Sequence, residues 1–369
     1  MNSRSKPISA GTNFVAHLNA EMGIGEVARR LASLLSAAGM NLNLVQFEAS
    51  TARKQQAIAQ KVGRFDSSLP TISCVNADQL GALVSFFGIA PNGQGAHRGF
   101  WAWELEDFPD KYLPASKLLD EIWTLSNFSE MSISKTVATK VKTIKVPVPI
   151  PKSETTLSRE DFGIAKNIFL VTSSFDFNSE VERKNPAGAI SAFMSAFPKP
   201  STATLLLKSI NGDKHPLALE SLRDQARNRK DIVFLDGYMN HYENHGLLEI
   251  SDVYLSLHRS EGYGLNLADS MARKTAVIAT GYSGNLDFMD EKSSVLIPFE
   301  KVPVSNYAGI RVHSKWANPD LDYASHKLRH LFNSPLETSK LANSGFSKIR
   351  DENSLKVVVE KFQKEFMDA

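Results

Sequence analysis

Two strand-turn-helix units follow one another between residues 252 and 288, in the sequence DVYLSLHRSEGYGLNLADSMARKTAVIATGYSGNLDF. In the first unit, the apolar run 253–257 suits a buried parallel strand, and a turn with two glycines follows before a helix that starts near Leu265. In the second unit, 276–279 is the strand and 281–285 is the turn. Parallel strands end at the same edge of a sheet, so the two turns predict a crevice for a ligand at that edge.

The chain has 369 residues, which is too long for one ordinary core and fits two domains. Strands and helices alternate in both halves, and this predicts an α/β protein with a doubly wound parallel sheet in each half. A proline-spaced segment at 145–151, KVPVPIP, cannot be helical and is the expected linker. We therefore predict one domain over 1–148 and a second over 149–348, followed by a closing helix over 349–369.

Charge and cysteine content exclude several classes of protein. The formal net charge is +2, so nothing in the totals indicates a nucleic-acid partner. Cys74 is the single cysteine, which excludes an intramolecular disulfide framework and fits a reducing compartment. No run approaches the ~20 apolar residues of a membrane helix, so we expect a cytoplasmic protein, with peripheral contact to the inner membrane face left open.

Two carboxylates in the first unit carry a more specific signal. Glu261 and Asp269 are eight positions apart (269 − 261), roughly two helical turns, so both can line one wall of the crevice. The sequence SEGYGLNLADSMA, followed by AVIATGYSGN, resembles the donor-binding signature of retaining glycosyltransferase family four. That signature usually has two glutamates with seven residues between them, and here Asp269 takes the second place. The alternative is a Rossmann-like pair whose glycines only allow close packing.

The resemblance implies the GT-B fold, in which two Rossmann-like domains face a central cleft. The first domain would lie on the acceptor side, the second would bind a nucleotide sugar, and 349–369 would pack back on the first domain. Glu261 would bind hydroxyls of the transferred sugar, and Asp269 the ribose. The expected donor-binding residues are Asp269, Gly262, Tyr263, Gly264, Leu265, Ser283, Gly284, Asn285, His258, Tyr238, Lys208, Gly23 and Gly25.

A departing nucleoside diphosphate carries about two negative charges, which a metal ion or basic side chains must stabilise. Arg183 and Lys184 precede a helix start at Asn185-Pro186, and they match the basic pair that contacts the diphosphate in the family. With Glu261, they are the expected catalytic residues. Many relatives also carry an arginine where this chain has Ser174. A solvated charge pair is the alternative interpretation of the two basic residues.

An Asp-x-Asp motif occurs at Asp320 and Asp322. It lies in a stretch after Pro298 that we expect to be mostly irregular, rather than at a strand end. We therefore expect a site without metal and no further cofactor beside the donor substrate.

The N-terminal half offers two candidate segments. The turn 19–26 places Gly23 and Gly25 at a helix start, where they allow close backbone approach or simple capping. The segment GFWAWELEDFPDKYLP carries Trp101, Trp103 and Glu104, an aromatic and acidic set suited to sugar rings on the acceptor side. The alternative is that both tryptophans belong to the core. This segment resembles bacterial mannosyltransferase-like members of the family that build surface polysaccharides.

The residues and the resemblance together predict a retaining, metal-independent transferase. It would move a hexose, with GDP-mannose the preferred donor and a UDP-linked sugar the other, to a glycan or lipid-linked acceptor. A non-catalytic relative that binds a glycan or a partner protein is one alternative. A nicotinamide-dependent oxidoreductase is another, although a third glycine after Gly23 and Gly25 is missing.

Overall fold

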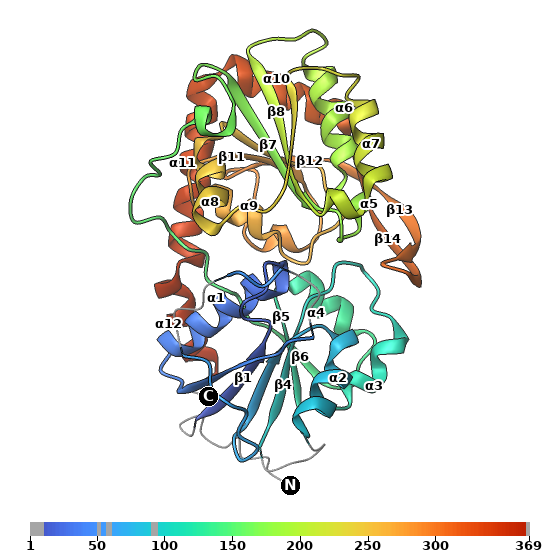
Figure 1. Cartoon of the computed structure of the whole chain (residues 1–369), viewed down its shortest axis with the longest axis vertical. Helices are drawn as coiled ribbons and strands as arrows, with labels where there is room; N and C mark the ends of the chain where they lie inside the picture. The colour runs from blue at the N-terminus through green and yellow to red at the C-terminus, as the bar shows by residue number, and fades with distance from the viewer. Residues whose placement is uncertain (1–10, 50–52, 57–60, 90–94, 367–369) are drawn as a thin grey trace. The chain divides into compact units, whose positions relative to one another are not determined.

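The computed structural model describes residues 11–49, 53–56, 61–89 and 95–366. The chain divides into two compact units (Figure 1). The first consists of residues 1–148 and 353–369, and the second of residues 149–352. The sequence placed its two boundaries after 148 and 348. Residues 1–10 and 367–369, at the ends of the predicted domains, lie outside the described residues.

The first unit is built on a six-stranded parallel sheet in the order β2-β1-β3-β4-β5-β6. Its strands are β1 (Thr12–Ala16), β2 (Leu42–Gln46), β3 (Thr71–Cys74), β4 (His97–Trp101), β5 (Glu121–Thr124) and β6 (Lys140–Thr143). Its helices are α1 (Gly23–Ala37), α2 (Ala77–Phe87), η1 (Asp110–Tyr112), α3 (Leu113–Ser116), α4 (Asn127–Ser134) and α12 (Leu355–Phe366). The predicted α/β architecture with a parallel sheet is confirmed in this unit.

The C-terminal helix α12 belongs to the first unit although 149–352 separates it in sequence from the rest. Gln363 donates a side-chain hydrogen bond to the carbonyl of Ala38, just past the end of α1. The ring of Phe362 lies edge-on to Trp123 of β5, with 6.2 Å between the ring centroids. Among the described residues, no helix is long and apolar enough to cross a membrane.

The second unit also has a six-stranded parallel sheet, in the order β12-β11-β10-β7-β8-β9. Its strands are β7 (Phe169–Asp176), β8 (Ala203–Ile210), β9 (Ile232–Asp236), β10 (Val253–Ser256), β11 (Ala276–Thr280) and β12 (Val295–Ile297). Its helices are η2 (Arg159–Phe162), α5 (Val181–Lys184), α6 (Pro186–Ala196), η3 (Gly212–Lys214), α7 (Pro216–Gln225), α8 (His241–Ile250), α9 (Leu265–Met271), η4 (Gly284–Asp287), α10 (Leu321–Asn333) and α11 (Pro335–Asn353). One core of apolar side chains joins β7, β8, β10 and β11 to α6 and α10.

A hairpin follows the second sheet, where the sequence predicted irregular structure. Its strands β13 (Phe299–Tyr307) and β14 (Ile310–Pro319) are antiparallel, with a bulge between Val304 and Asn306. Pro303 and other turn-forming residues obscure the alternation of apolar and polar side chains that would predict these strands from the sequence. A two-stranded ribbon accepts a proline because each strand has one edge free of ladder bonds. The expectation of a mostly irregular segment is therefore wrong.

The predicted helix start at Asn185 is confirmed, and the side chain of this residue connects α6 to the end of β10. The Asn185 side chain accepts a hydrogen bond of 3.0 Å from the Gly188 N–H and donates one of 2.8 Å to the carbonyl of Leu257, just after β10. The backbone of Asn185 is left-handed, with φ of 54°, a conformation that asparagine tolerates better than most residues. One side chain thus fixes α6 and the end of β10.

We expect the Asn185→Ala variant to lose about 2–4 kcal/mol of unfolding free energy, because it loses the cap, leaves a buried carbonyl without its donor and places alanine at a positive φ. Asn185→Gly is the matched control. It loses the same bonds but accepts the backbone angle, so it should be about 1 kcal/mol more stable than the alanine variant. Calorimetric unfolding checks this order, and an alanine variant at least as stable as the glycine one would contradict it.

Candidate active site

The predicted donor residues of the second unit gather at the carboxyl edge of its sheet. Glu261 follows β10, the 281–285 turn follows β11, and α5 with Lys184 lies on the connection after β7. These three strands are neighbours in the order β11-β10-β7, so their ends meet. The crevice position predicted from the sequence is therefore occupied by the expected polar groups.

Glu261 is buried and forms ion pairs with both basic residues of α5. Its Oε1 lies 2.5 Å from Lys184 Nζ, and its Oε2 lies 3.2 Å from Arg183 Nη1. Burial raises the pKa of Glu261, but the attraction of Lys184 and then Arg183 outweighs it and lowers the pKa to about 2. The carboxylate is therefore ionised at neutral pH, and the three side chains together carry a net charge of +1 (2 − 1).

The 281–285 turn holds the backbone of Glu261 from the other side. Ser283 Oγ accepts a hydrogen bond of 2.7 Å from the Glu261 N–H, and the Gly284 N–H donates one of 2.9 Å to the Glu261 carbonyl. Ser283 has φ of 77° and ψ of −148°, a region that a residue with a side chain enters only under strain. Gly284 is one of the expected donor-binding residues, but its N–H is engaged by the Glu261 carbonyl. The turn positions the carboxylate.

His258 supports the same turn and is fully buried. One ring nitrogen, Nδ1, lies 3.0 Å from Ser256 Oγ, and the other, Nε2, lies 3.3 Å from the Tyr282 carbonyl and 3.2 Å from Asn285 Oδ1. Burial lowers the pKa of His258, so the ring is neutral at neutral pH. These contacts favour an orienting role over contact with a ligand, for both His258 and Asn285.

The Glu261–Leu265 turn leads directly into α9. Gly264 caps the helix with φ of 95°, an angle that favours glycine, and Leu265 is the first helical residue. The Tyr263 ring is buried against Phe288, with 4.8 Å between centroids. The Tyr263 ring therefore belongs to the core, and the donor-binding role of this turn residue stays a prediction.

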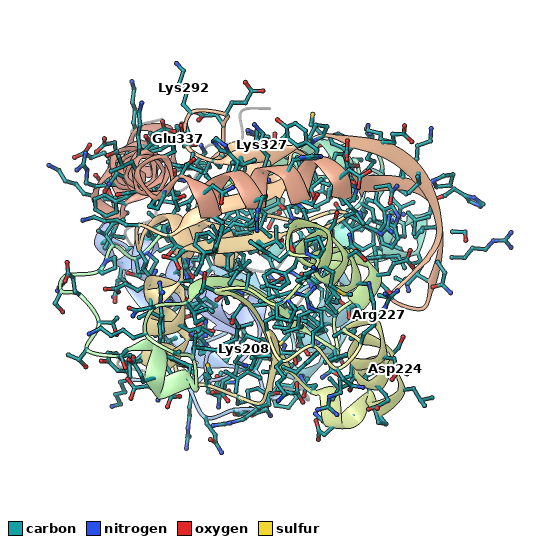
Figure 2. The ribbon with its side chains drawn as sticks, turned by 90° about the horizontal axis from the view of Figure 1, so that it is seen from above. Lys208, Asp224, Arg227, Lys292, Lys327 and Glu337 are labelled. Carbon is teal, nitrogen blue, oxygen red and sulfur yellow. The ribbon has the colours of Figure 1, made fainter. Side chains whose placement is uncertain are left out.

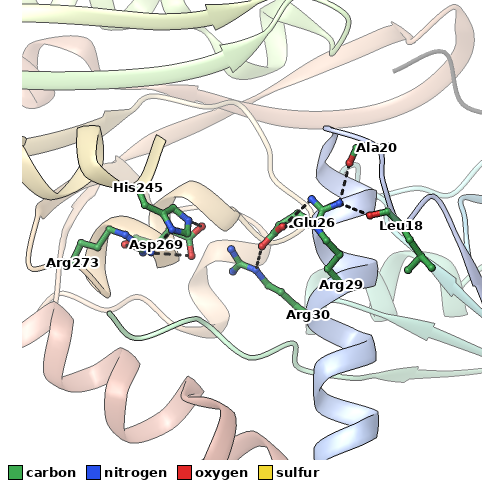
Figure 3. A network of polar contacts seen from close by, with 8 residues as sticks. All are labelled: Leu18, Ala20, Glu26, Arg29, Arg30, His245, Asp269 and Arg273. Atoms are coloured by element: carbon green, nitrogen blue, oxygen red, sulfur yellow. Dashed lines mark hydrogen bonds and ion pairs between the residues drawn. The ribbon is translucent and has the colours of Figure 1, made fainter. Parts of the chain in front are cut away.

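Asp269, the second predicted carboxylate, lies in α9 within a cluster of basic side chains (Figure 3). Its Oδ2 is 3.7 Å from His245 Nε2, and its Oδ1 is 4.0 Å from Arg273 Nη1. Arg273 also contacts Nδ1 of His245 at 2.5 Å. The His241 ring lies 3.7 Å from that of His245, centroid to centroid. His241, His245 and Arg273 were not expected from the sequence, where the signal for them is two histidines one helical turn apart.

Lys208 and Tyr238 lie on the neighbouring strand ends. Lys208 in β8 is buried within the second unit, in contrast to the outward side chain of Lys292 (Figure 2). Its ammonium donates to the carbonyls of Ser209 and Gly237. Tyr238 donates to Asn211 Oδ1 at 3.2 Å. Lys208 thus holds the backbone that precedes Tyr238.

In the first unit, Gly23 is the first residue of α1, and Gly25 packs closely against the backbone of Ala20. A Cβ on Gly25 would lie 2.5 Å from the Ala20 carbonyl oxygen, whereas one on Gly23 would meet nothing within 4 Å. Close packing therefore explains Gly25. Next to it, Glu26 binds Arg29 at 2.9 Å and Arg30 at 2.7 Å (Figure 3).

The tryptophans of the first unit are core residues, so their expected place on an acceptor surface is wrong. Trp101 is 0% and Trp103 6% exposed. Trp101 stacks on Phe108 at 5.7 Å, and Trp103 meets the same ring edge-on at 5.3 Å. An indole enclosed by its own unit has no face left for a sugar. Glu104, between the buried positions, is half-buried.

Within the described ranges, no three His, Cys, Asp or Glu side chains are grouped as metal ligands. The Asp-x-Asp motif instead starts a helix. Asp320 caps α10 by accepting a hydrogen bond of 2.8 Å from the Tyr323 N–H, and Asp322 lies in the first turn. This is a correction to the loop predicted there.

Residues 166–302 match the family described as glycosyl transferases group 1. No curated protein matches the chain in sequence. The structure resembles Anabaena HepE in complex with UDP and glucose, with a TM-score of 0.67, 13% identity, and coverage of 97% of this chain and 100% of that one. It also resembles a sucrose-phosphate synthase from Thermosynechococcus elongatus (TM-score 0.70, 13% identity, 97% and 98% coverage) and a glycosyltransferase from Rickettsia africae (0.65, 14%, 98% and 98%). The fold is therefore GT-B, as the sequence predicted.

The buried ammonium of Lys208 gives the second unit a pH-dependent stability. Burial lowers its pKa to about 8 from 10.5, against the opposing pull of Asp236 and Asp176. Between these two pH values the unfolded chain binds the proton and the folded one does not, so the contribution of Lys208 to stability rises with pH across the window. From pH 7 to pH 9.5, wild type should gain about 2 kcal/mol of unfolding free energy relative to Lys208→Met. A difference between the two proteins that does not change with pH would contradict this assignment.

Proposed function

We propose that this protein is a retaining glycosyltransferase that moves a hexose from a nucleoside-diphosphate sugar to an acceptor hydroxyl without a metal ion. The buried centre of Arg183, Lys184 and Glu261 at the carboxyl edge of the second sheet carries this proposal. It supplies a fixed carboxylate and an excess of positive charge in one place. The match of residues 166–302 to the group 1 family supports the same reaction class.

The two cations serve the leaving group. As the bond between the anomeric carbon and the phosphate oxygen breaks, negative charge develops on the diphosphate, and Lys184 and Arg183 stabilise it. The acceptor oxygen forms the new bond on the same face, and the departing phosphate oxygen takes the acceptor proton. This sequence requires positioning and electrostatics from the protein rather than a strong base.

Glu261 serves the sugar. Its low pKa keeps it ionised, so it accepts hydrogen bonds from hydroxyls and does not deliver a proton. The two cations hold its carboxylate, and the Ser283 hydroxyl and the Gly284 N–H hold its backbone. Because the carboxylate is already fixed before the donor binds, it can orient the sugar ring without reorganisation.

The Asp269 cluster serves the ribose in this proposal. Asp269 is the carboxylate for the ribose hydroxyls, and His245 beside it offers a further polar group at the same place. Lys208 fixes the Gly237 carbonyl and so the loop that carries Tyr238 toward the base. The donor contacts thus come from the connection between β9 and α8, from α8 and from α9 together.

Two kinds of nucleotide sugar, GDP-linked and UDP-linked, are the candidate donors. GDP-mannose is the sequence-based choice, but it depended partly on the Trp101–Glu104 segment, and both tryptophans there are buried. UDP and glucose are bound in HepE, and UDP with N-acetylglucosamine in a pneumococcal transferase of TM-score 0.57 and 15% identity. We propose a UDP- or GDP-linked hexose as donor and a glycan or lipid-linked acceptor in polysaccharide synthesis.

We expect Lys184→Ala to lower kcat at least 10²–10³-fold, because one charge that stabilises the leaving diphosphate is lost. The assay is release of UDP or GDP from UDP-glucose and GDP-mannose, measured both with and without chelator. Lys292→Ala removes an exposed lysine of the same unit and should leave the rate unchanged. A folded Lys184→Ala variant with near-normal turnover would reject the role of this lysine, and activity that disappears with chelator would reject the metal-free site.

A further inference from the structure

The β13–β14 hairpin separates its side chains into a buried face and a basic face. On β14, Val312, Ser314 and Trp316 are buried, while the alternate residues Arg311, His313 and Lys315 are exposed. A strand points successive side chains to opposite faces, so the three exposed residues form one row about 7 Å apart from one to the next. The register places Pro303 opposite Lys315 and Lys301 opposite Ala317, so Lys301 extends the same face.

We propose that this face, Lys301, Arg311, His313 and Lys315, binds an acidic glycan. Within the part of the chain that the structure describes, no acidic side chain lies within ion-pair distance of Arg311 or Lys315. The acidic residue of the hairpin, Glu300, lies opposite Asn318 in the strand register, on the other face. Arg311 and Lys315 thus place two formal positive charges in the β14 row. Lys301 adds a third beside that row, with its Nζ 5.7 Å from the Tyr282 ring centroid.

The buried face keeps this row fixed. The Arg259 guanidinium lies 5.7 Å from the Trp316 ring centroid, and Ala317 donates a hydrogen bond of 2.8 Å to the Arg259 carbonyl. At the turn of the hairpin, the Ala308 N–H donates to Glu180 just before α5, at 3.2 Å. Both ends of the ribbon are therefore tied to the second unit, and the charges are held in place before a ligand arrives.

The same contacts connect the row to the proposed centre. The Arg259 N–H donates a hydrogen bond of 2.7 Å to the Arg183 carbonyl, and Tyr282 Oη donates one of 3.4 Å to the Lys315 carbonyl. The hairpin is thus joined to the segments that carry Arg183 and Ser283. This step rests on the proposed function: if the protein is a glycosyltransferase, its acceptor is an acidic glycan, because an acceptor held on the hairpin lies beside the donor loops.

The surface favours a glycan over the two other common polyanions. A membrane contact needs apolar side chains beside its charges, since each Lys or Arg adds only about 1 kcal/mol at an anionic surface, and no large apolar side chain of the hairpin is exposed among the described residues. A nucleic-acid site makes about 6–10 phosphate contacts or stacks bases on aromatic rings. A single line of charges suits a linear chain whose carboxylates recur at intervals.

The test is equilibrium binding of fluorescent decagalacturonate to the full chain at low salt, comparing Arg311→Glu/Lys315→Glu with Lys292→Glu/Lys327→Glu. Both variants change the net charge by the same amount, and Lys292 and Lys327 lie elsewhere on the second unit (Figure 2). We expect the hairpin variant to weaken binding at least tenfold and the control variant by less than twofold. Arg311→Lys/Lys315→Arg should bind as wild type does, which separates charge from folding.

Equal weakening in both charge-reversal variants, or no binding by wild type, would overturn the proposal. So would tighter binding to a neutral dextran, to phosphatidylglycerol vesicles or to a DNA duplex than to decagalacturonate. A second measurement, the rise in Tm when the nucleotide-sugar donor is added, tests the proposed function independently of glycan binding. The hairpin variant should keep that rise and Lys184→Ala should lose it, so absence of the rise in wild type rejects the proposed function alone.

Discussion

The second unit depends on a buried carboxylate that is stable only because two cations lie against it. An isolated buried Glu261 would take up a proton, and removal of both cations would leave its negative charge without compensation. Arg183 and Lys184 reach it from α5, and Ser283 and Gly284 fix its backbone from the neighbouring strand end. Connections after three strands of the sheet therefore converge on one residue, Glu261.

Parallel topology makes this convergence possible. Strands β7, β10 and β11 are adjacent and end at one edge, so short connections deliver basic, acidic and turn residues to a common place. Around it, Asn185 and His258 use their polar atoms to join the same connections. The centre is thus surrounded by residues whose role is to hold it in position, and a preorganised charge arrangement is the main requirement of diphosphate departure.

Much of this could be predicted from the sequence because the relevant signals are local. The glycine turns, the apolar strands and the Asn185-Pro186 helix start each follow from a few adjacent residues. Three features could not be predicted in this way. The hairpin hides its alternation behind Pro303 and a bulge, the His245–Arg273 cluster brings together two helices, and the fate of Trp101 depends on Phe108 closing over it. Each of these is decided by packing between distant segments, which periodicity does not reveal.

The most direct measurement is calorimetric titration of the protein with UDP, UMP, GDP and GMP in the presence of chelator. If Arg183 and Lys184 hold the diphosphate, the preferred diphosphate should bind at least tenfold more tightly than its monophosphate, and Lys184→Ala should remove that preference while the monophosphate affinity stays the same. Equal affinity of the wild type for diphosphate and monophosphate, or a Lys184→Ala variant that keeps the wild-type preference, would contradict the assignment of this centre to the leaving group.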